Sequence, residues 1–114
     1  MPNATRTFSY DEALATLPTV RGLTEAALRQ ISALYARVQS QEELERRRDE
    51  IESTVEQIVQ AWSEEVVALG CEVKGLWLVD WDSGHGYYCW RYPEESIRHF
   101  HGYDDGFAGR IPIN

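Results

Sequence analysis

The sequence is poor in the features that identify many functional classes. Its 114 residues include two cysteines, one methionine and four prolines, and 11 Lys and Arg stand against 19 Asp and Glu, a net charge of −8. No stretch approaches the roughly 20 apolar residues of a membrane-spanning helix, and residues 1–6 show no signal-peptide pattern. An acidic chain also repels phosphate backbones and anionic lipids. We therefore expect a cytoplasmic protein, a single domain over residues 1–114, with neither nucleic acid nor membrane as a partner.

Motifs of common enzymes and cofactor sites are missing as well. The sequence has no P-loop, GxGxxG or HExxH pattern, and its Ser, His and Asp residues show no triad order. Cys71 and Cys89 lack CxxC or zinc-finger spacing, which predicts two reduced thiols, with a disulfide as the less favoured alternative. Composition and motifs therefore identify no reaction.

A first helix is indicated at the start of the chain. Ser9 and Glu12 have the spacing of a capping box, in which each side chain accepts a hydrogen bond from the other's backbone amide. Apolar or small residues then recur every three or four positions as far as Val38. Pro18 lies too deep for the first turn, so we expect it to kink the helix or end it at Leu17.

A second helix is expected from about Glu42 to Leu69. Its apolar residues recur at helical spacing, and Gly70 is placed to end it in the left-handed conformation. Two long helices joined by a few residues form an antiparallel hairpin, here over residues 9–70. Such a pair leaves one flank exposed, and either the sheet or a second copy of the protein must cover it; the flank is formed by Leu23, Leu28, Tyr35 and Val59.

Residues 73–101 have the composition of a small antiparallel sheet. Two runs rich in β-branched and aromatic residues flank a turn at Gly84, and a two-residue loop there pairs Val79 with Tyr88. One predicted face is aromatic and consists of Trp77, Val79, Trp81, Tyr88 and Trp90. The other is mixed and consists of Leu76, Leu78, Asp80, Tyr87, Cys89 and Arg91.

A third strand is expected over residues 97–101. The simplest pairing places His99 opposite Trp90, so that His99 and His101, two residues apart, share the aromatic face. The chain then closes with an irregular tail over residues 102–114.

Three segments resemble an uncharacterised bacterial family, domain of unknown function 2203. They are Phe-Ser-Tyr-Asp-Glu-Ala at residues 8–13, Cys-Trp-Arg at 89–91 and Gly-Phe-Ala-Gly-Arg at 106–110. The resemblance extends over nearly the whole chain and implies a small bacterial cytoplasmic protein without an assigned activity. The family's Trp-His-Glu pattern is Phe-His-Gly here, so Gly102 replaces a carboxylate.

One candidate site is a metal centre on the third strand. His99 and His101 can offer two imidazole nitrogens on one face, and Asp104 or Asp105 can supply a carboxylate. Glu64 or Glu65 of the second helix are alternative third ligands. A divalent transition metal is the cofactor that this hypothesis implies. The alternative is that the histidines fill a polar margin of the core.

A second candidate site, for a ligand, combines Asp80, Cys89, Arg91 and Arg110. Arg110 can hold an anion, and Cys89 becomes a nucleophile if a histidine removes its proton. The structural alternative has Phe107 anchoring the tail in the core and Arg110 pairing with Asp80, Asp104 or a helix carboxylate.

Together these patterns predict an α+β fold in which a long antiparallel helical hairpin packs with a three-stranded antiparallel meander. The favoured function is a non-catalytic binding or assembly module, expected as a homodimer, whose partner meets a helix flank or the mixed sheet face. The alternative is a metal-binding or metal-dependent hydrolase-like site on His99, His101 and Asp104 or Asp105.

Overall fold

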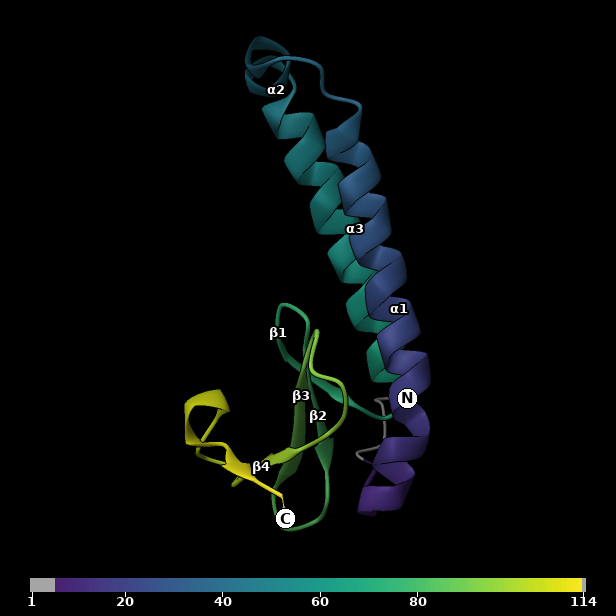
Figure 1. Cartoon of the computed structure of the whole chain (residues 1–114), viewed down its shortest axis with the longest axis vertical. Coiled ribbons are helices and arrows are strands. Elements are labelled where there is room, and N and C mark those ends of the chain that lie inside the picture. The colour runs from purple at the N-terminus through teal and green to yellow at the C-terminus, as the bar shows by residue number, and fades with distance from the viewer. Residues whose placement is uncertain (1–5, 114) are drawn as a thin grey trace.

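A long helical hairpin dominates the computed structural model, which describes residues 6–113. The hairpin consists of α1 (Tyr10–Ala36), the short α2 (Gln41–Arg46) at its tip and α3 (Arg48–Ala68), which returns beside α1 (Figure 1). No helix of the described range is both long and apolar enough to cross a membrane. The expectation about a signal peptide at residues 1–6 falls almost wholly outside the described residues.

The predicted capping box begins α1. The Glu12 amide donates to Ser9 Oγ at 3.1 Å, and the Ser9 amide donates to Glu12 Oε1 at 2.8 Å. The prediction that the helix could end at Leu17 is wrong, because α1 continues through Pro18. Leu17 and Val20, on either side of Pro18, are both buried. Their burial compensates for the one helical hydrogen bond that proline removes.

The second helix is divided where the sequence predicted continuity. Arg47 separates α2 from α3 with φ −100° and ψ 9°, outside the helical region. Its guanidinium pairs with Glu43 at 3.1 Å and with Glu50 at 2.8 Å, so it holds both helix ends together. The predicted left-handed end is confirmed, since Gly70 has φ +96° directly after the helix. A Cβ at Gly70 would also meet the Arg6 side chain at 3.1 Å.

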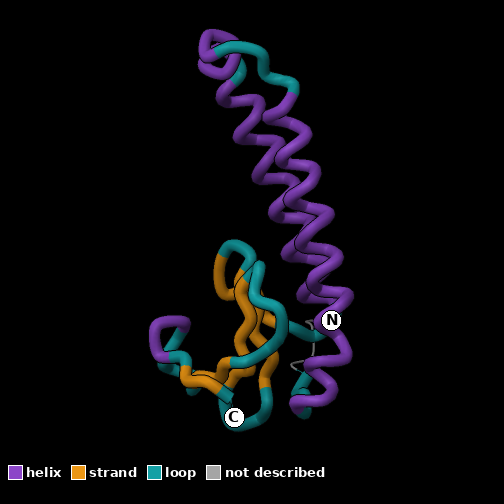
Figure 2. Tube along the Cα trace, viewed as in Figure 1, coloured by secondary structure: helices purple, strands orange, loops and turns teal. Residues whose placement is uncertain are grey.

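Five short strands form one antiparallel sheet, so the α+β prediction is confirmed and the strand count of three is wrong. Their order along the sheet follows the sequence, and Figure 2 shows the strands gathered beside one end of the helical hairpin. The strands are β1 (Glu72–Gly75), β2 (Leu78–Asp82), β3 (Tyr87–Arg91), β4 (His99–His101) and β5 (Ile111–Pro112). The expected irregular tail therefore contributes the edge strand β5, and a 3-10 turn at Phe107–Gly109 precedes it.

The turn between β2 and β3 is longer than the predicted two residues. Val79 pairs with Trp90 rather than with Tyr88, and Ser83 and Gly86 close the turn with a backbone hydrogen bond of 2.8 Å. The register is displaced by two positions, which leaves every side chain on its predicted face. Trp77, however, lies in the turn before β2 with φ +60°.

The aromatic face of the sheet packs against the helices and forms the core. The sheet lies beside the end of the hairpin where α1 begins and α3 finishes, and the rest of the hairpin extends beyond it (Figure 1). Trp62 of α3 meets Trp77 edge to face at 4.9 Å, and Trp62 Nε1 donates to Thr24 Oγ1 of α1 at 2.9 Å. The largest fully buried side chains of this core include Trp62, Trp81 and Trp90.

Candidate functional site

The sheet face that points away from the helices carries a row of polar side chains. Asp80 of β2 pairs with Cys89 of β3, and Cys89 pairs with His99 of β4. Paired residues of neighbouring strands point to the same face, so the three side chains lie side by side. The expected pairing of His99 with Trp90 is therefore wrong by one residue, and both histidines lie on the mixed face rather than the aromatic one.

His101 and Asp80 form a buried pair that spans β3. His101 is 4% exposed and Asp80 0%, and Nε2 of His101 lies 2.8 Å from Oδ2 of Asp80. Nδ1 of His101 lies 2.8 Å from the Gly102 carbonyl oxygen. A carbonyl oxygen only accepts, so Nδ1 carries a hydrogen. One more proton lies between Nε2 and Oδ2, either on the imidazolium or on the carboxylic acid.

Cys89 lies with this pair and is a poor nucleophile. Burial, reinforced by the Asp80 carboxylate, raises the pKa of the Cys89 thiol to about 12. Burial likewise raises the pKa of Asp80, and the neighbouring Cys89 and His101 side chains counteract only part of that rise. The thiol is therefore protonated in neutral solution, although nucleophilic attack requires the thiolate.

Arg110 pairs with Glu94, a residue that the sequence analysis did not consider. Its guanidinium nitrogens lie 3.0 Å from Oε1 and 3.0 Å from Oε2 of Glu94, a two-pronged ion pair. Phe107 is 38% exposed rather than a core anchor, with Arg110 4.1 Å from its ring centroid and Arg91 5.4 Å from it. The expected partners of Arg110 and the expected burial of Phe107 are therefore wrong.

We expect Arg110→Gln to lower the free energy of unfolding by about 1–2 kcal/mol near neutral pH. Burial alone would raise the pKa of Glu94, but hydrogen bonds from Arg110 and the Arg91 amide hold it below its ordinary 4.5. A carboxylate with a lowered pKa in the folded state stabilises above the unfolded value, and that stability is lost as pH falls through the folded value. Denaturant unfolding should show the full difference from the wild type above pH 4.5, and the difference should shrink progressively as the pH falls below that value. A difference that stays constant across this range would contradict the assigned pair.

The four residues of the predicted metal site do not come together. Asp104 and Asp105 are exposed, and Oδ2 of Asp105 accepts a hydrogen bond from the Gly102 amide at 3.1 Å. His99 lies 3.8 Å from Glu94 through its Nδ1. Within residues 6–113, the group of three side chains able to share a metal ion is instead Asp80, Cys89 and His101.

One signal in the sequence favours the observed register of β4. The strand reads His-Phe-His, so its apolar residue alternates with its polar ones. Phe100 lies opposite Tyr88, with ring centroids 5.7 Å apart, on the aromatic face. Placing Phe100 rather than the histidines on that face would have brought His101 toward Asp80.

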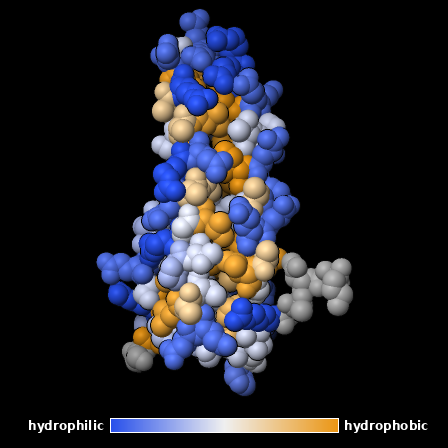
Figure 3. Space-filling model, turned by 90° about the vertical axis from the view of Figure 1, so that its right-hand side faces the viewer, coloured by the Kyte–Doolittle hydropathy of each residue, from blue (hydrophilic) through white to orange (hydrophobic). Residues whose placement is uncertain are grey.

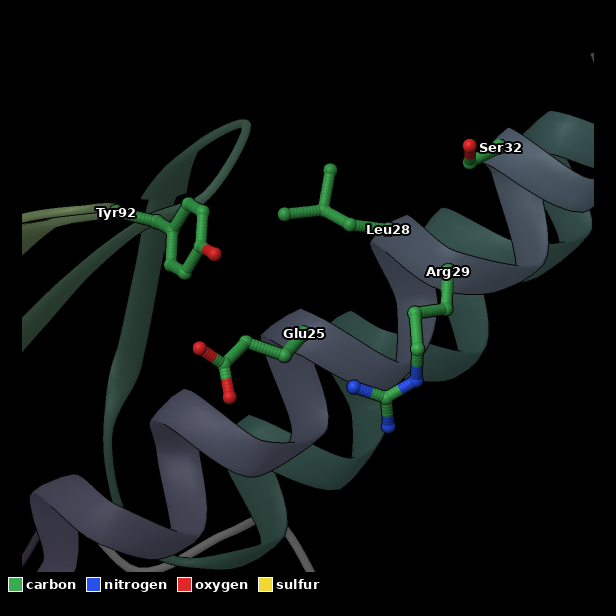
Figure 4. Close-up of a pocket in the computed structure, with 5 residues that line it drawn as sticks. All are labelled: Glu25, Leu28, Arg29, Ser32 and Tyr92. Carbon is green, nitrogen blue, oxygen red and sulfur yellow. The ribbon is translucent and has the colours of Figure 1, made fainter.

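A shallow groove marks the place where the sheet stops covering α1. Tyr92, from the segment after β3, faces Glu25 and Leu28 of α1 across it (Figure 4), and its volume is 360 Å³. In the flank predicted to be exposed, Leu23 and Val59 pack against the core. Tyr35, 45% exposed, lies further toward the tip.

Comparison with known proteins identifies a family but no activity. A family model described as "Uncharacterized conserved protein (DUF2203)" matches residues 6–113. Searches of curated proteins and of solved structures returned no match. Because the match covers nearly the whole chain, the protein belongs to the DUF2203 family.

Proposed function

We propose that the protein is a non-catalytic assembly module that forms a homodimer through the free end of its helical hairpin. We call this end, residues 28–61, the arm. One observation carries the proposal: the apolar stripe of α1 continues toward the tip beyond the last buried residue of that helix. The buried residues of α1 are Ala13, Leu17, Val20, Thr24 and Ala27.

The arm continues the stripe without the cover that the sheet gives elsewhere. Ile31 and Leu34 of α1 and Val55 of α3 are only half-buried, although they follow the same spacing as the buried residues. Ile51 of α3, also in the arm, is buried. Hydrophobic residues extend along the hairpin between hydrophilic flanks on the face shown in Figure 3. Two helices alone leave part of each apolar stripe in water.

A second copy of the chain is the partner that fits this surface. Each copy presents an apolar stripe with steps of three and four residues, and two such hairpins can pack as a four-helix arrangement. A two-fold contact matches the stripe with itself, so no further protein is needed. Dimer formation would remove Tyr35 and the half-buried stripe from water.

The mixed face of the sheet, the other surface expected to meet a partner, is a weaker candidate than the helix flank. Asp80 and Cys89 are fully buried, so neither can meet a protein partner. Arg91 is exposed but lies beside Phe107. The helix flank is therefore the better supported of the two surfaces.

The substitution Tyr35→Glu tests the proposal, with Ala33→Glu as its matched control. At 3.6 residues per turn the two side chains point about 160° apart on α1. Tyr35 and Ala33 are both exposed, but Tyr35 borders the apolar stripe, whereas Ala33 points away from it. We expect a carboxylate at position 35 to weaken dimerisation at least about tenfold, since its burial without a partner is unfavourable.

Analytical gel filtration over a dilution series measures the effect. The wild type and Ala33→Glu should dissociate at the same concentration, and Tyr35→Glu should dissociate at a higher one. Circular dichroism should show the same helix content for all three, because Tyr35 is not part of the monomer core. Equal dissociation of both variants would place any dimer contact elsewhere and overturn the proposal.

A further inference from the structure

Three side chains of metal-binding chemistry meet inside the protein, on three neighbouring strands. Asp80 comes from β2, Cys89 from β3 and His101 from β4. One ligand atom of each lies within 4.8 Å of the other two. All three residues are buried, so the cluster is unlike the exposed acidic groups that gather on protein surfaces by chance.

Two features of the cluster suit a ligand that the protein itself does not supply. Oδ1 of Asp80 is buried and has no hydrogen-bond partner among residues 6–113. Such an orphaned atom is costly in a protein interior. His101 is also oriented as metal-bound histidines usually are, because its Nδ1 donates to a backbone carbonyl and its Nε2 faces the cluster.

We propose that Asp80, Cys89 and His101 bind one divalent transition-metal ion of the zinc type, through a carboxylate oxygen, Sγ and Nε2. Thiolate and imidazole ligands favour Zn²⁺ or Co²⁺ over the hard cations Mg²⁺ and Ca²⁺, which prefer oxygen ligands. The site goes beyond the proposed assembly function, since it lies on the sheet face away from the arm.

The net charge of the cluster is the same with and without the metal ion, so metal binding is compatible with its burial. Without metal, Asp80 and His101 share one proton and the Cys89 thiol holds another, so the cluster carries no net charge. A divalent ion displaces both protons, and its two positive charges balance one carboxylate and one thiolate. The cluster is therefore neutral in both states, which avoids the large cost of burying net charge.

Metal binding requires the three ligand atoms, which lie within 4.8 Å of one another, to adjust their spacing. Zinc binds sulfur at about 2.3 Å and nitrogen or oxygen at about 2.0–2.2 Å, so tetrahedral ligand atoms lie about 3.3–3.7 Å apart. Nε2 of His101 and Oδ2 of Asp80 are 2.8 Å apart, and they must separate slightly when the ion replaces the proton between them. Rotation of the carboxylate that brings Oδ1 toward the ion also relieves its lack of a partner.

Cobalt titration of the untagged protein, stripped of metal with a chelator, tests the site. The chain has two cysteines, and both are buried free thiols. In the Cys71→Ser variant Cys89 is the remaining thiol, so a thiolate-to-cobalt charge-transfer band in that variant must arise from Cys89. We expect the band at one Co²⁺ per chain, its loss when one equivalent of Zn²⁺ is added, and release of two protons per ion in weakly buffered solution.

Three results would overturn the site, and the first two use protein that is expected to fold. One is the absence of a charge-transfer band in Cys71→Ser at saturating Co²⁺. Another is a melting temperature of the wild type that rises equally with Zn²⁺ and with Mg²⁺, because that response indicates non-specific surface binding. In Cys89→Ser, provided that its circular dichroism is native, we expect no band, and a persisting band would also contradict the assignment.

Discussion

Replacing Trp62 with alanine is expected to lower the free energy of unfolding by about 3–5 kcal/mol and the melting temperature by roughly 10–20 °C. Trp62 is 2% exposed and joins three parts of the fold. It projects from α3, donates to Thr24 of α1 and packs edge to face with Trp77 before β2. Its loss leaves a large cavity at the point where helices and sheet meet.

Trp62→Phe separates packing from hydrogen bonding at this position. Phenylalanine retains an aromatic ring for Trp77 but cannot donate to Thr24, whose hydroxyl still donates to the Val20 carbonyl at 2.8 Å. We expect less than half of the alanine effect. Thermal denaturation followed by circular dichroism measures both variants, and an alanine variant within about 0.5 kcal/mol of the wild type would contradict the packing.

Replacing His101 with alanine is expected to destabilise the metal-free protein by about 3–5 kcal/mol, because Asp80 then remains buried without its partner. The magnitude rests on the 2.8 Å contact between the two side chains and on their nearly complete burial. Chemical unfolding near neutral pH in the presence of a chelator measures it.

His85→Ala is the matched control for this substitution. His85 is exposed in the turn between β2 and β3, and surface substitutions of this kind change stability by less than about 0.5 kcal/mol. Equal effects at positions 85 and 101 would show that the buried pair contributes nothing specific.

The helical hairpin could be predicted from sequence because its signals are local. The capping box at Ser9, the apolar spacing and Gly70 each depend on residues within one or two helical turns. The errors arose at two positions where burial or ion pairs override the preference of the backbone. Pro18 is accommodated by burial of its neighbours, and the division at Arg47 depends on ion pairs to both adjoining helices.

The sheet was predictable in its faces but not in its pairings. Alternation of side chains separates aromatic from polar residues whatever the turn length, so Val79, Trp81 and Trp90 were placed correctly. Turn length sets the register, and the extra residues in the turn after Asp82 shifted it by two positions. The two-residue edge strand β5 is too short to show any periodicity.

The candidate site depended on register and was therefore the least predictable part. From sequence, Asp80 and Cys89 belong to one candidate site and His101 to the other, because pairing His99 with Trp90 places both histidines on the aromatic face. A shift of one residue moves a whole strand to the other face. The Arg110 and Glu94 pair joins two irregular segments, where spacing carries no information on contact.

The mass of the wild-type protein in solution tests the central claim of assembly through the arm most directly. Sedimentation equilibrium at high micromolar concentration should give 26.2 kDa, twice the chain mass of 13.1 kDa. The apparent mass should fall toward that of one chain on dilution. A single species of 13.1 kDa at the highest concentration would contradict the homodimer, since the half-buried stripe of the arm would then be stable in water without a second copy.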